Sequence, residues 1–435
     1  MPRTFALAAA VAVLLSGLGC SDEPAAEART NDDASSTPAA TASTPTSQAA
    51  VAAGDQTRPE VARAMAHIEH LSVAIGPRPA GSEAERAAAA YLVDQLAAAG
   101  YRASVEEFTF EAAKDDSTVT LPDGAVVRAL AMEGAANDEV SATAVHGGLG
   151  RPEDLAGADL DGKVVIFDRG IITFADKARA AVAGGAVAVI VVNDEPGLFL
   201  GSLGDAGIAI PVVAVPGEAA AEVEASIGRQ ITVVTDAGIE TITSQNVVGR
   251  IGDSCHAYLG GHYDTVAVSP GANDNASGTA VVLEVARTNP VEGLCVILFG
   301  AEELGLFGSQ NYVAEHLAGT ARFMLNIDMA GVLDSPMIVG DRDLTREILE
   351  AITDAGVASS LRAGRFPPFA SSDHVSFEAV GVPSVTFNAG ADDEVIHTPG
   401  DTFDRIEEAT VSMLLDSVDA ALDALVAANA DALAR

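Results

Sequence analysis

The chain has 435 residues, 49% of them hydrophobic, which is enough to bury one large core and leaves room for a second domain. Its 62 acidic and 24 basic residues give a formal charge of -38, which repels phosphate backbones and argues against nucleic acid as a partner. Trp is absent and only 4% of residues are aromatic, so a broad carbohydrate-stacking surface is also disfavoured.

Residues 1–20 have the composition of an export signal. Arg3 supplies the positive start, Ala6–Leu15 is an apolar run too short to span a bilayer, and small residues precede Cys20. Cys20 resembles the acylated cysteine of a bacterial lipobox, although Gly17 stands where that pattern usually has Leu. Two destinations stay open: a cell-envelope lipoprotein that contacts a membrane only through a lipid on Cys20, or a secreted or periplasmic protein.

The next segments lead from a linker into folded structure. Residues 21–55 are rich in Ala, Ser, Thr, Pro and Asp and hold almost nothing to bury, which predicts a disordered linker. Helical periodicity begins near Pro59. The Ser and Glu at 82 and 85 have the spacing of a capping box, which predicts a helix that runs to Ala99. The alternating residues 104–110 then predict a strand.

Residues 126–239 follow a different rhythm, in which short apolar runs alternate with Ala-rich segments. The pattern resembles a protease-associated (PA) domain, a small lid that is inserted in various peptidases. No cluster of metal-binding side chains occurs in it, so we expect a role in substrate access or partner contact rather than chemistry. The predicted strands lie at 164–167, 187–192 and 210–215, and a predicted helix lies at 174–182.

Beyond residue 244 strands and helices alternate regularly, and the last helix is expected at 407–428. Continuous apolar strands interleaved with helices predict an α/β fold, with a mostly parallel mixed sheet sandwiched by helices. Ligands of such sheets lie outside the carboxyl ends of the strands. The predicted strands are 246–251, 255–261, 295–300, 322–327, 336–339 and 383–387.

Five short motifs lie after apolar runs of this region or in loops close by, and each carries side chains that can bind a metal. Imidazole nitrogens and carboxylate oxygens without a thiolate suit zinc or a similar divalent ion that does chemistry. The motifs therefore predict a metallo-hydrolase. In chain order they are G-G-H-Y-D (His262, Asp264), G-A-N-D-N-A-S-G (Asp274), G-A-E-E (Glu302, Glu303), N-I-D-M (Asp328) and I-H-T-P-G-D-T (His397).

Each of these residues also has a simpler interpretation. Asp274 lies in a Gly/Ala/Ser-rich loop, where Asp is a common turn residue. Asp328 could cap a helix after its strand, and His397 could be an ordinary loop histidine. Glu302 and Glu303 could both be solvated charges.

The five motifs in this order, with G-P-R-P-A-G-S at 76–82, resemble metallopeptidase family twenty-eight, the co-catalytic di-zinc aminopeptidases. The resemblance implies a zinc-peptidase domain over 56–125 and 240–435, with the PA domain inserted at 126–239. It also implies two Zn²⁺ per chain, with five ligands: His262, Asp274, Glu303, Asp328 and His397.

The resemblance assigns a role to each carboxylate. Asp274 would bridge the two ions, Glu302 would be the general base on the metal-bound water, and Asp264 would orient His262 through its other ring nitrogen. A two-metal site about 3.5–4 Å across does need one carboxylate that binds both ions. Metal-binding histidines usually have an outer carboxylate partner. One departure is Ile396, which stands where some members have a Tyr that helps hold the tetrahedral intermediate.

Two further features leave alternatives open. The segment 371–374, Ser-Ser-Asp-His, resembles a family loop near the pocket, with a structural or substrate-contacting role expected and a metal-ligand role as the alternative. Cys255 and Cys295 precede His262 and Glu302 by the same number of residues, so a disulfide is expected if the two strands are neighbours. The other interpretation is two buried small hydrophobic residues.

These patterns predict an exported zinc aminopeptidase whose partners are peptide substrates. Carboxypeptidase, dipeptidase or glutaminyl cyclase activity of the same fold is the first alternative. A catalytically inactive scaffold that binds a partner through the PA domain is the second, because the transferrin-receptor relatives of the family imply it. Such a scaffold should have lost metal ligands, and this chain has kept all of them.

Overall fold

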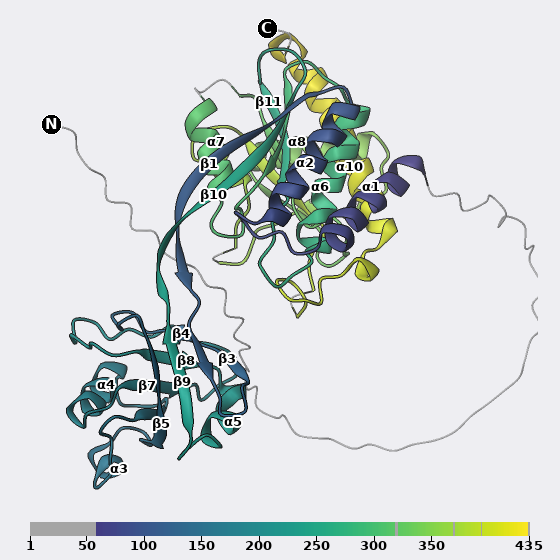
Figure 1. Cartoon of the computed structure of the whole chain (residues 1–435). Helices are drawn as coiled ribbons and strands as arrows, with labels where there is room; N and C mark the ends of the chain where they lie inside the picture. The colour runs from purple at the N-terminus through teal and green to yellow at the C-terminus, as the bar shows by residue number, and fades with distance from the viewer. Residues whose placement is uncertain (1–57, 318–320, 369, 393, 434–435) are drawn as a thin grey trace, which may run out of the picture. The chain divides into compact units, whose positions relative to one another are not determined.

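The computed structural model describes residues 58–317, 321–368, 370–392 and 394–433 (Figure 1). The expected signal (1–20) and linker (21–55) lie outside the described residues. The described chain divides into two compact units, residues 109–242 and residues 58–108 with 243–433. The chain passes from one unit to the other along two long strands, β1 (Arg102–Asp115) and β10 (Ala237–Arg250).

The larger unit is built on an eight-stranded sheet with the order β1-β10-β12-β11-β13-β16-β14-β15. Its four central strands, β12, β11, β13 and β16, are parallel, whereas β10 and β14 join antiparallel at either side. The predicted mostly parallel mixed sheet is therefore confirmed. The further strands are β11 (Ala257–His262), β12 (Leu294–Phe299), β13 (Met324–Ile327), β14 (Met337–Gly340), β15 (Arg362–Ala363) and β16 (Ser384–Asn388).

Helices cover both faces of this sheet, as the continuous apolar strands require. Neighbouring strand residues point into different cores: Val296 packs with α1, α2, α6, α8 and α10, and Ile297 packs with residues of α7 and α9. The helices are α1 (Pro59–Glu69), α2 (Glu83–Ala98), α6 (Gly278–Thr288), α7 (Phe307–His316), α8 (Arg342–Asp354), α9 (His374–Glu378) and α10 (Glu408–Leu433).

The start of α2 differs in one respect from the predicted capping box. The Ser82 side chain accepts the Glu85 N–H at 3.0 Å, as an N-cap residue does. The Glu85 carboxylate, however, accepts from the Gly81 N–H and from the Ser244 hydroxyl rather than from the Ser82 N–H. Glu85 is fully buried, and its carboxylate joins the α2 start to the middle of β10.

The smaller unit contains a second eight-stranded sheet, with the order β3-β2-β9-β5-β6-β7-β8-β4. Strands β5 to β8 are parallel and form its centre. The strands are β2 (Thr118–Thr120), β3 (Val126–Arg128), β4 (Leu130–Ala131), β5 (Asp138–His146), β6 (Val164–Asp168), β7 (Ala188–Val192), β8 (Val212–Val215) and β9 (Gln230–Thr235). The helices are α3 (Pro152–Leu155), α4 (Phe174–Ala183) and α5 (Ala220–Glu224).

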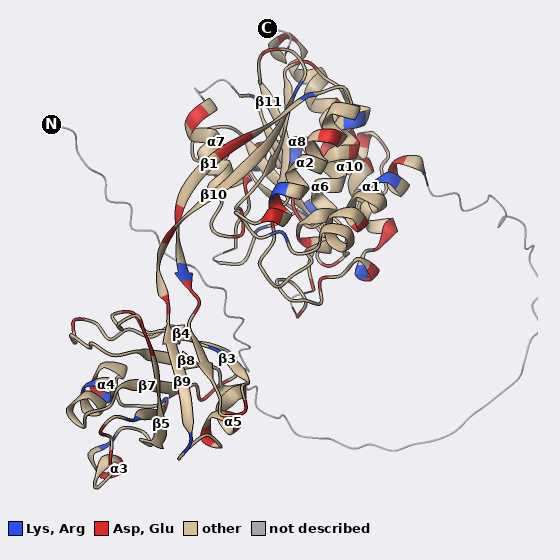
Figure 2. Cartoon of the chain, in the orientation of Figure 1, with Lys and Arg blue, Asp and Glu red and all other residues tan. Residues whose placement is uncertain are grey.

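Cys255 and Cys295 form a disulfide with a Cα–Cα distance of 5.4 Å. The pairing follows from the neighbouring strands, since β11 and β12 lie in parallel register with Tyr258 opposite Cys295. Acidic segments outnumber basic ones in both units, in keeping with the composition (Figure 2). In the described residues, none of the helices is both long and apolar enough to span a bilayer.

Candidate metal centre

The side chains of the five motifs lie at one edge of the larger sheet. His262 is the last residue of β11, Asp328 directly follows β13, and Glu302 and Glu303 lie in the loop after β12. His397 lies in the loop after β16. These four strands are parallel, so their carboxyl ends meet at the same edge, where ligands of α/β sheets bind.

Asp274 lies at the centre of this group. It lies in a kinked turn, Ala272–Ser277, where its own backbone is not helical and which leads directly into α6. Its Oδ1 is 3.2 Å from His262 Nε2, and its Oδ2 is 3.0 Å from His397 Nε2. One carboxylate therefore faces both histidines, one oxygen toward each.

The remaining carboxylates contact one histidine each. Asp328 Oδ1 is 3.4 Å from His262 Nε2, and Glu303 Oε2 is 3.1 Å from His397 Nε2. The structure thus brings together all five residues that the sequence analysis expected to bind metal. They divide into two groups that share Asp274.

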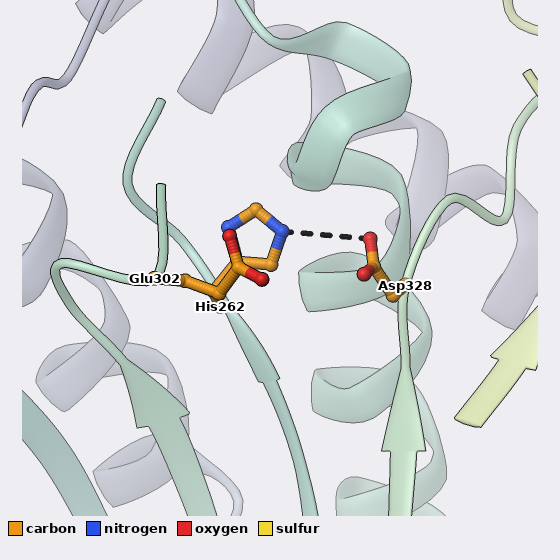
Figure 3. Close-up of side chains that lie close together, drawn as sticks. All are labelled: His262, Glu302 and Asp328. Carbon is orange, nitrogen blue, oxygen red and sulfur yellow. Dashed lines mark ion pairs between the residues drawn. The ribbon is translucent and has the colours of Figure 1, made fainter. Parts of the chain in front are cut away.

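Glu302 reaches the His262 half of the site. Its carboxylate and single atoms of His262 and Asp328 all lie within 4.8 Å of one another. Figure 3 shows that these three side chains converge from three separate segments, with the ion pair drawn between His262 and Asp328. Glu303, the next residue, faces the other half, so adjacent glutamates point to different parts of the site.

Asp264 makes contacts that the sequence did not predict. Its Oδ1 faces His262 Nδ1, the ring nitrogen that it was expected to orient, at an ion-pair distance of 3.6 Å. The carboxylate also accepts two backbone N–H groups that were not expected, that of Glu302 at 3.1 Å and that of Glu303 at 3.3 Å. Asp264 is fully buried and holds the turn that carries both glutamates.

The site concentrates negative charge away from water. Burial and neighbouring carboxylates raise the pKa of Glu302 well above its usual value, and burial with the nearby Asp274 raises that of Glu303 to about 7. Burial would also raise the pKa of Asp274, but contacts with both histidines hold it below its usual value. Hydrogen bonds to Asp274 and Glu303 raise the pKa of His397 to about 11. These carboxylates therefore need positive charge in order to ionise together.

The same residues fit a bound cation. Among the described residues, eight buried side-chain atoms lack a hydrogen-bond partner, and two of them are carboxylate oxygens of this cluster, Glu303 Oε1 and Asp328 Oδ1. Ligand atoms held at about 2.0–2.1 Å by one tetrahedral ion would lie about 3.3 Å apart. The distances between the histidine nitrogens and the carboxylate oxygens of the cluster are close to this value. Nitrogen and oxygen donors without sulfur favour zinc or a similar divalent ion.

Three further residues lie near the site: Asp401, from the last of the five motifs, and Asp373 and His374, from the segment 371–374 whose role the sequence left open. Asp401 accepts the backbone N–H groups of Asn273 and Asp274 at 2.8 and 3.0 Å. Asp373 is fully buried, and burial raises its pKa to about 7. The neighbouring His374 pairs its Nδ1 with the Thr386 hydroxyl at 2.7 Å, and burial lowers its pKa to about 4.

A small pocket borders Asp274 on the side of the His397 loop. Val332, Val395 and Ile396 supply apolar walls, and Asp392 and Arg405 form an ion pair beside them. Ile396 has no hydroxyl, so at this position the pocket lacks the donor that a Tyr would provide.

Comparisons with known proteins agree with this arrangement. The model of peptidase family M28 matches residues 246–421, and the PA domain model matches residues 123–223. Aminopeptidase YwaD of Bacillus subtilis (strain 168) is 32% identical over 381 residues, which is 82% of each chain. The probable lipoprotein aminopeptidase LpqL of Mycobacterium tuberculosis is 30% identical over 370 residues, covering 75% of this chain and 73% of its own.

Solved structures give the same result. An aminopeptidase from Aneurinibacillus sp. strain AM-1 has a TM-score of 0.55 and 32% identity, covering 83% of this chain and 93% of its own. BSAP, a zinc aminopeptidase from Bacillus subtilis, has a TM-score of 0.60 and 29% identity, covering 84% of this chain and 95% of its own.

Proposed function

The chain belongs to peptidase family M28, and on that basis we propose that it is an exported zinc aminopeptidase that removes N-terminal residues from peptides. The observation that carries the proposal is Asp274, whose two carboxylate oxygens face His262 and His397. A carboxylate in this position is suited to bridge two ions. We assign His262 and Asp328 to one ion, and Glu303 and His397 to the other.

In the proposed mechanism Glu302 is the general base. Zinc held by the five ligands would polarise the scissile carbonyl and lower the pKa of a nearby water to roughly 7. Glu302 takes a proton from the water while the water oxygen bonds to the carbonyl carbon. Glu302 then passes this proton to the leaving amine as the C–N bond breaks.

Export is part of the proposal. The disulfide between Cys255 and Cys295 is a feature of oxidising compartments rather than of the cytosol. A relative whose name describes a probable lipoprotein aminopeptidase supports acylation of Cys20. We therefore propose a cell-envelope lipoprotein, with a freely secreted form as the alternative.

An assay with paired substrates tests the activity. We expect hydrolysis of Leu-p-nitroanilide and of a short peptide with a free N-terminus, and no hydrolysis of the N-acetylated peptide. Release of the C-terminal residue from the acetylated peptide would instead indicate a carboxypeptidase. Protein that contains zinc and cleaves none of these substrates would favour the cyclase, and protein that neither binds zinc nor cleaves would favour the inactive scaffold.

A further inference from the structure

Asn275, the residue after Asp274, makes hydrogen bonds with both ends of its side-chain amide. It is fully buried. Its Nδ2 donates to the carbonyl oxygens of His262 at 3.3 Å and Ile327 at 3.0 Å. Its Oδ1 accepts the N–H groups of Gly278 at 2.9 Å and Met329 at 3.1 Å. The amide has two donor hydrogens and two acceptor lone pairs, so its hydrogen-bonding capacity is fully used.

The backbones of these partners carry two of the proposed ligands, His262 and Asp328. The carbonyl of His262 belongs to a ligand itself, and Ile327 and Met329 flank Asp328 on either side. Asn275 is joined by its own backbone to Asp274. One side chain therefore connects the end of β11, the end of β13 and the turn before α6.

Gly278 leaves room for the Asn275 amide because it has no side chain. A Cβ added at Gly278 would lie 2.3 Å from Asn275 Oδ1 and 2.5 Å from the Ile327 carbonyl oxygen. The glycine lets α6 begin close enough for its first N–H to bond the amide. The hydrogen bond between Asn275 and Gly278 therefore depends on the residue type at both positions.

We propose that Asn275 is a positioning residue that holds His262, Asp274 and Asp328 in their mutual arrangement before any metal binds. The inference rests on the proposed function, since it takes these residues to be metal ligands. An Asp at position 275 has nearly the same shape but cannot donate. It would remove a donor from two buried carbonyl oxygens, of which that of His262 would keep only the Thr279 hydroxyl, and it would add a negative charge beside three carboxylates.

The test compares Zn²⁺ affinity of metal-free wild type, Asn275→Asp and Asn275→Ser by competition with a chromophoric chelator. Asn193→Asp is the matched control, because Asn193 is also buried and donates to a carbonyl, that of Gly197, but lies in the smaller unit. Circular dichroism and thermal unfolding of the metal-free proteins show which variants fold. Outer residues that hold metal ligands typically contribute about 10–100-fold to metal affinity.

We expect folded Asn275 variants to bind Zn²⁺ about 10–100-fold more weakly than wild type, and Asn193→Asp to bind it normally even if its melting temperature falls. Folded Asn275 variants with an affinity within about twofold of wild type would overturn the proposal. Failure of both Asn275 variants to fold would assign the residue to folding alone and would overturn it as well. If wild type itself bound no Zn²⁺, the proposed function would fail rather than the role of Asn275.

Discussion

Asp264 accepts the backbone N–H of Glu302 at 3.1 Å, so it fixes the turn that carries the proposed general base. Asp264→Asn would exchange one acceptor oxygen for a donor and leave one of the two N–H groups of Glu302 and Glu303 unpaired. We expect kcat to fall about 10–100-fold. Steady-state kinetics on Leu-p-nitroanilide measures the change, with zinc content determined on the same sample. A kcat within twofold of wild type would show that the turn holds its shape without this carboxylate.

Glu302→Gln removes the proton acceptor and keeps the shape of the side chain. General-base catalysis typically contributes 10²–10⁴-fold, so we expect kcat to fall by about that factor while zinc content stays at the wild-type level. Glu83→Gln is a suitable control, because Glu83 is an exposed glutamate in the first turn of α2. A Glu302→Gln enzyme that keeps more than a tenth of wild-type activity would show that the base is a different group.

Removal of metal should destabilise the larger unit as well as abolish activity. Among the described residues, His262 and His397 are the cations in direct contact with the cluster of buried carboxylates, and they compensate its charge only in part. Zinc at 100 times its dissociation constant would stabilise the folded state by about 2.7 kcal/mol. We therefore expect a chelator to lower the melting temperature and eliminate peptidase activity, and added Zn²⁺ to restore both. Activity that persists after verified removal of all metal would contradict the assignment of these residues as ligands.

Part of the site could be predicted from the sequence because His262, Glu303 and Asp328 each end or follow an apolar run. The apolar runs of β11, β12 and β13 mark buried parallel strands, and polar residues placed after them fall at one sheet edge. The resemblance to a known family then supplied the roles. The contacts of Asp264, Asn275 and Asp401 could not be predicted in this way. They bond backbone groups distant in the chain or buried in loops, and no spacing rule encodes such contacts.

The limits of β10 also show which features have a local sequence signal and which do not. The sequence predicted a strand at 246–251, whereas β10 begins at Ala237. Residues 237–243 are exposed or half-buried, so they lack the apolar pattern of a buried strand. They nevertheless belong to β10, whose neighbour in the sheet is β1. Hydrophobic periodicity detects burial, so it misses strand residues that stay exposed.

The disulfide should contribute measurably to stability. Cys255 and Cys295 are separated by 40 positions. In the chain-entropy model, closing a loop of this size lowers the entropy of the unfolded chain and so stabilises the folded state by about 3–4 kcal/mol. We expect a reductant to lower the melting temperature of the wild type. A Cys255→Ala/Cys295→Ala double variant should melt lower than oxidised wild type and not respond to the reductant. A wild-type melting temperature that ignores full reduction would contradict this expectation.

The buried Glu85 should make stability depend on pH. Burial raises its pKa from the usual 4.5 to about 7, even though Gly81 and Ser244 donate hydrogen bonds to it. The folded state thus binds this proton more tightly than the unfolded state, so the group stabilises most below about pH 4.5 and loses this contribution as the pH rises through about 7. A shift of this size corresponds to roughly 3 kcal/mol.

Glu85→Gln isolates that contribution, because a neutral amide cannot titrate and the other titrating groups are common to both proteins. Denaturant unfolding at pH 5 and pH 8.5 gives the free energy of unfolding of each protein. We expect the variant to gain stability relative to wild type between these two pH values, by an amount of up to roughly 3 kcal/mol. Replacing the carboxylic hydroxyl of Glu85 by the amide NH₂ of Gln also changes the free energy of unfolding. That change is the same at every pH. A stability difference that stays constant from pH 5 to pH 8.5 would show that Glu85 keeps an ordinary pKa in the folded protein.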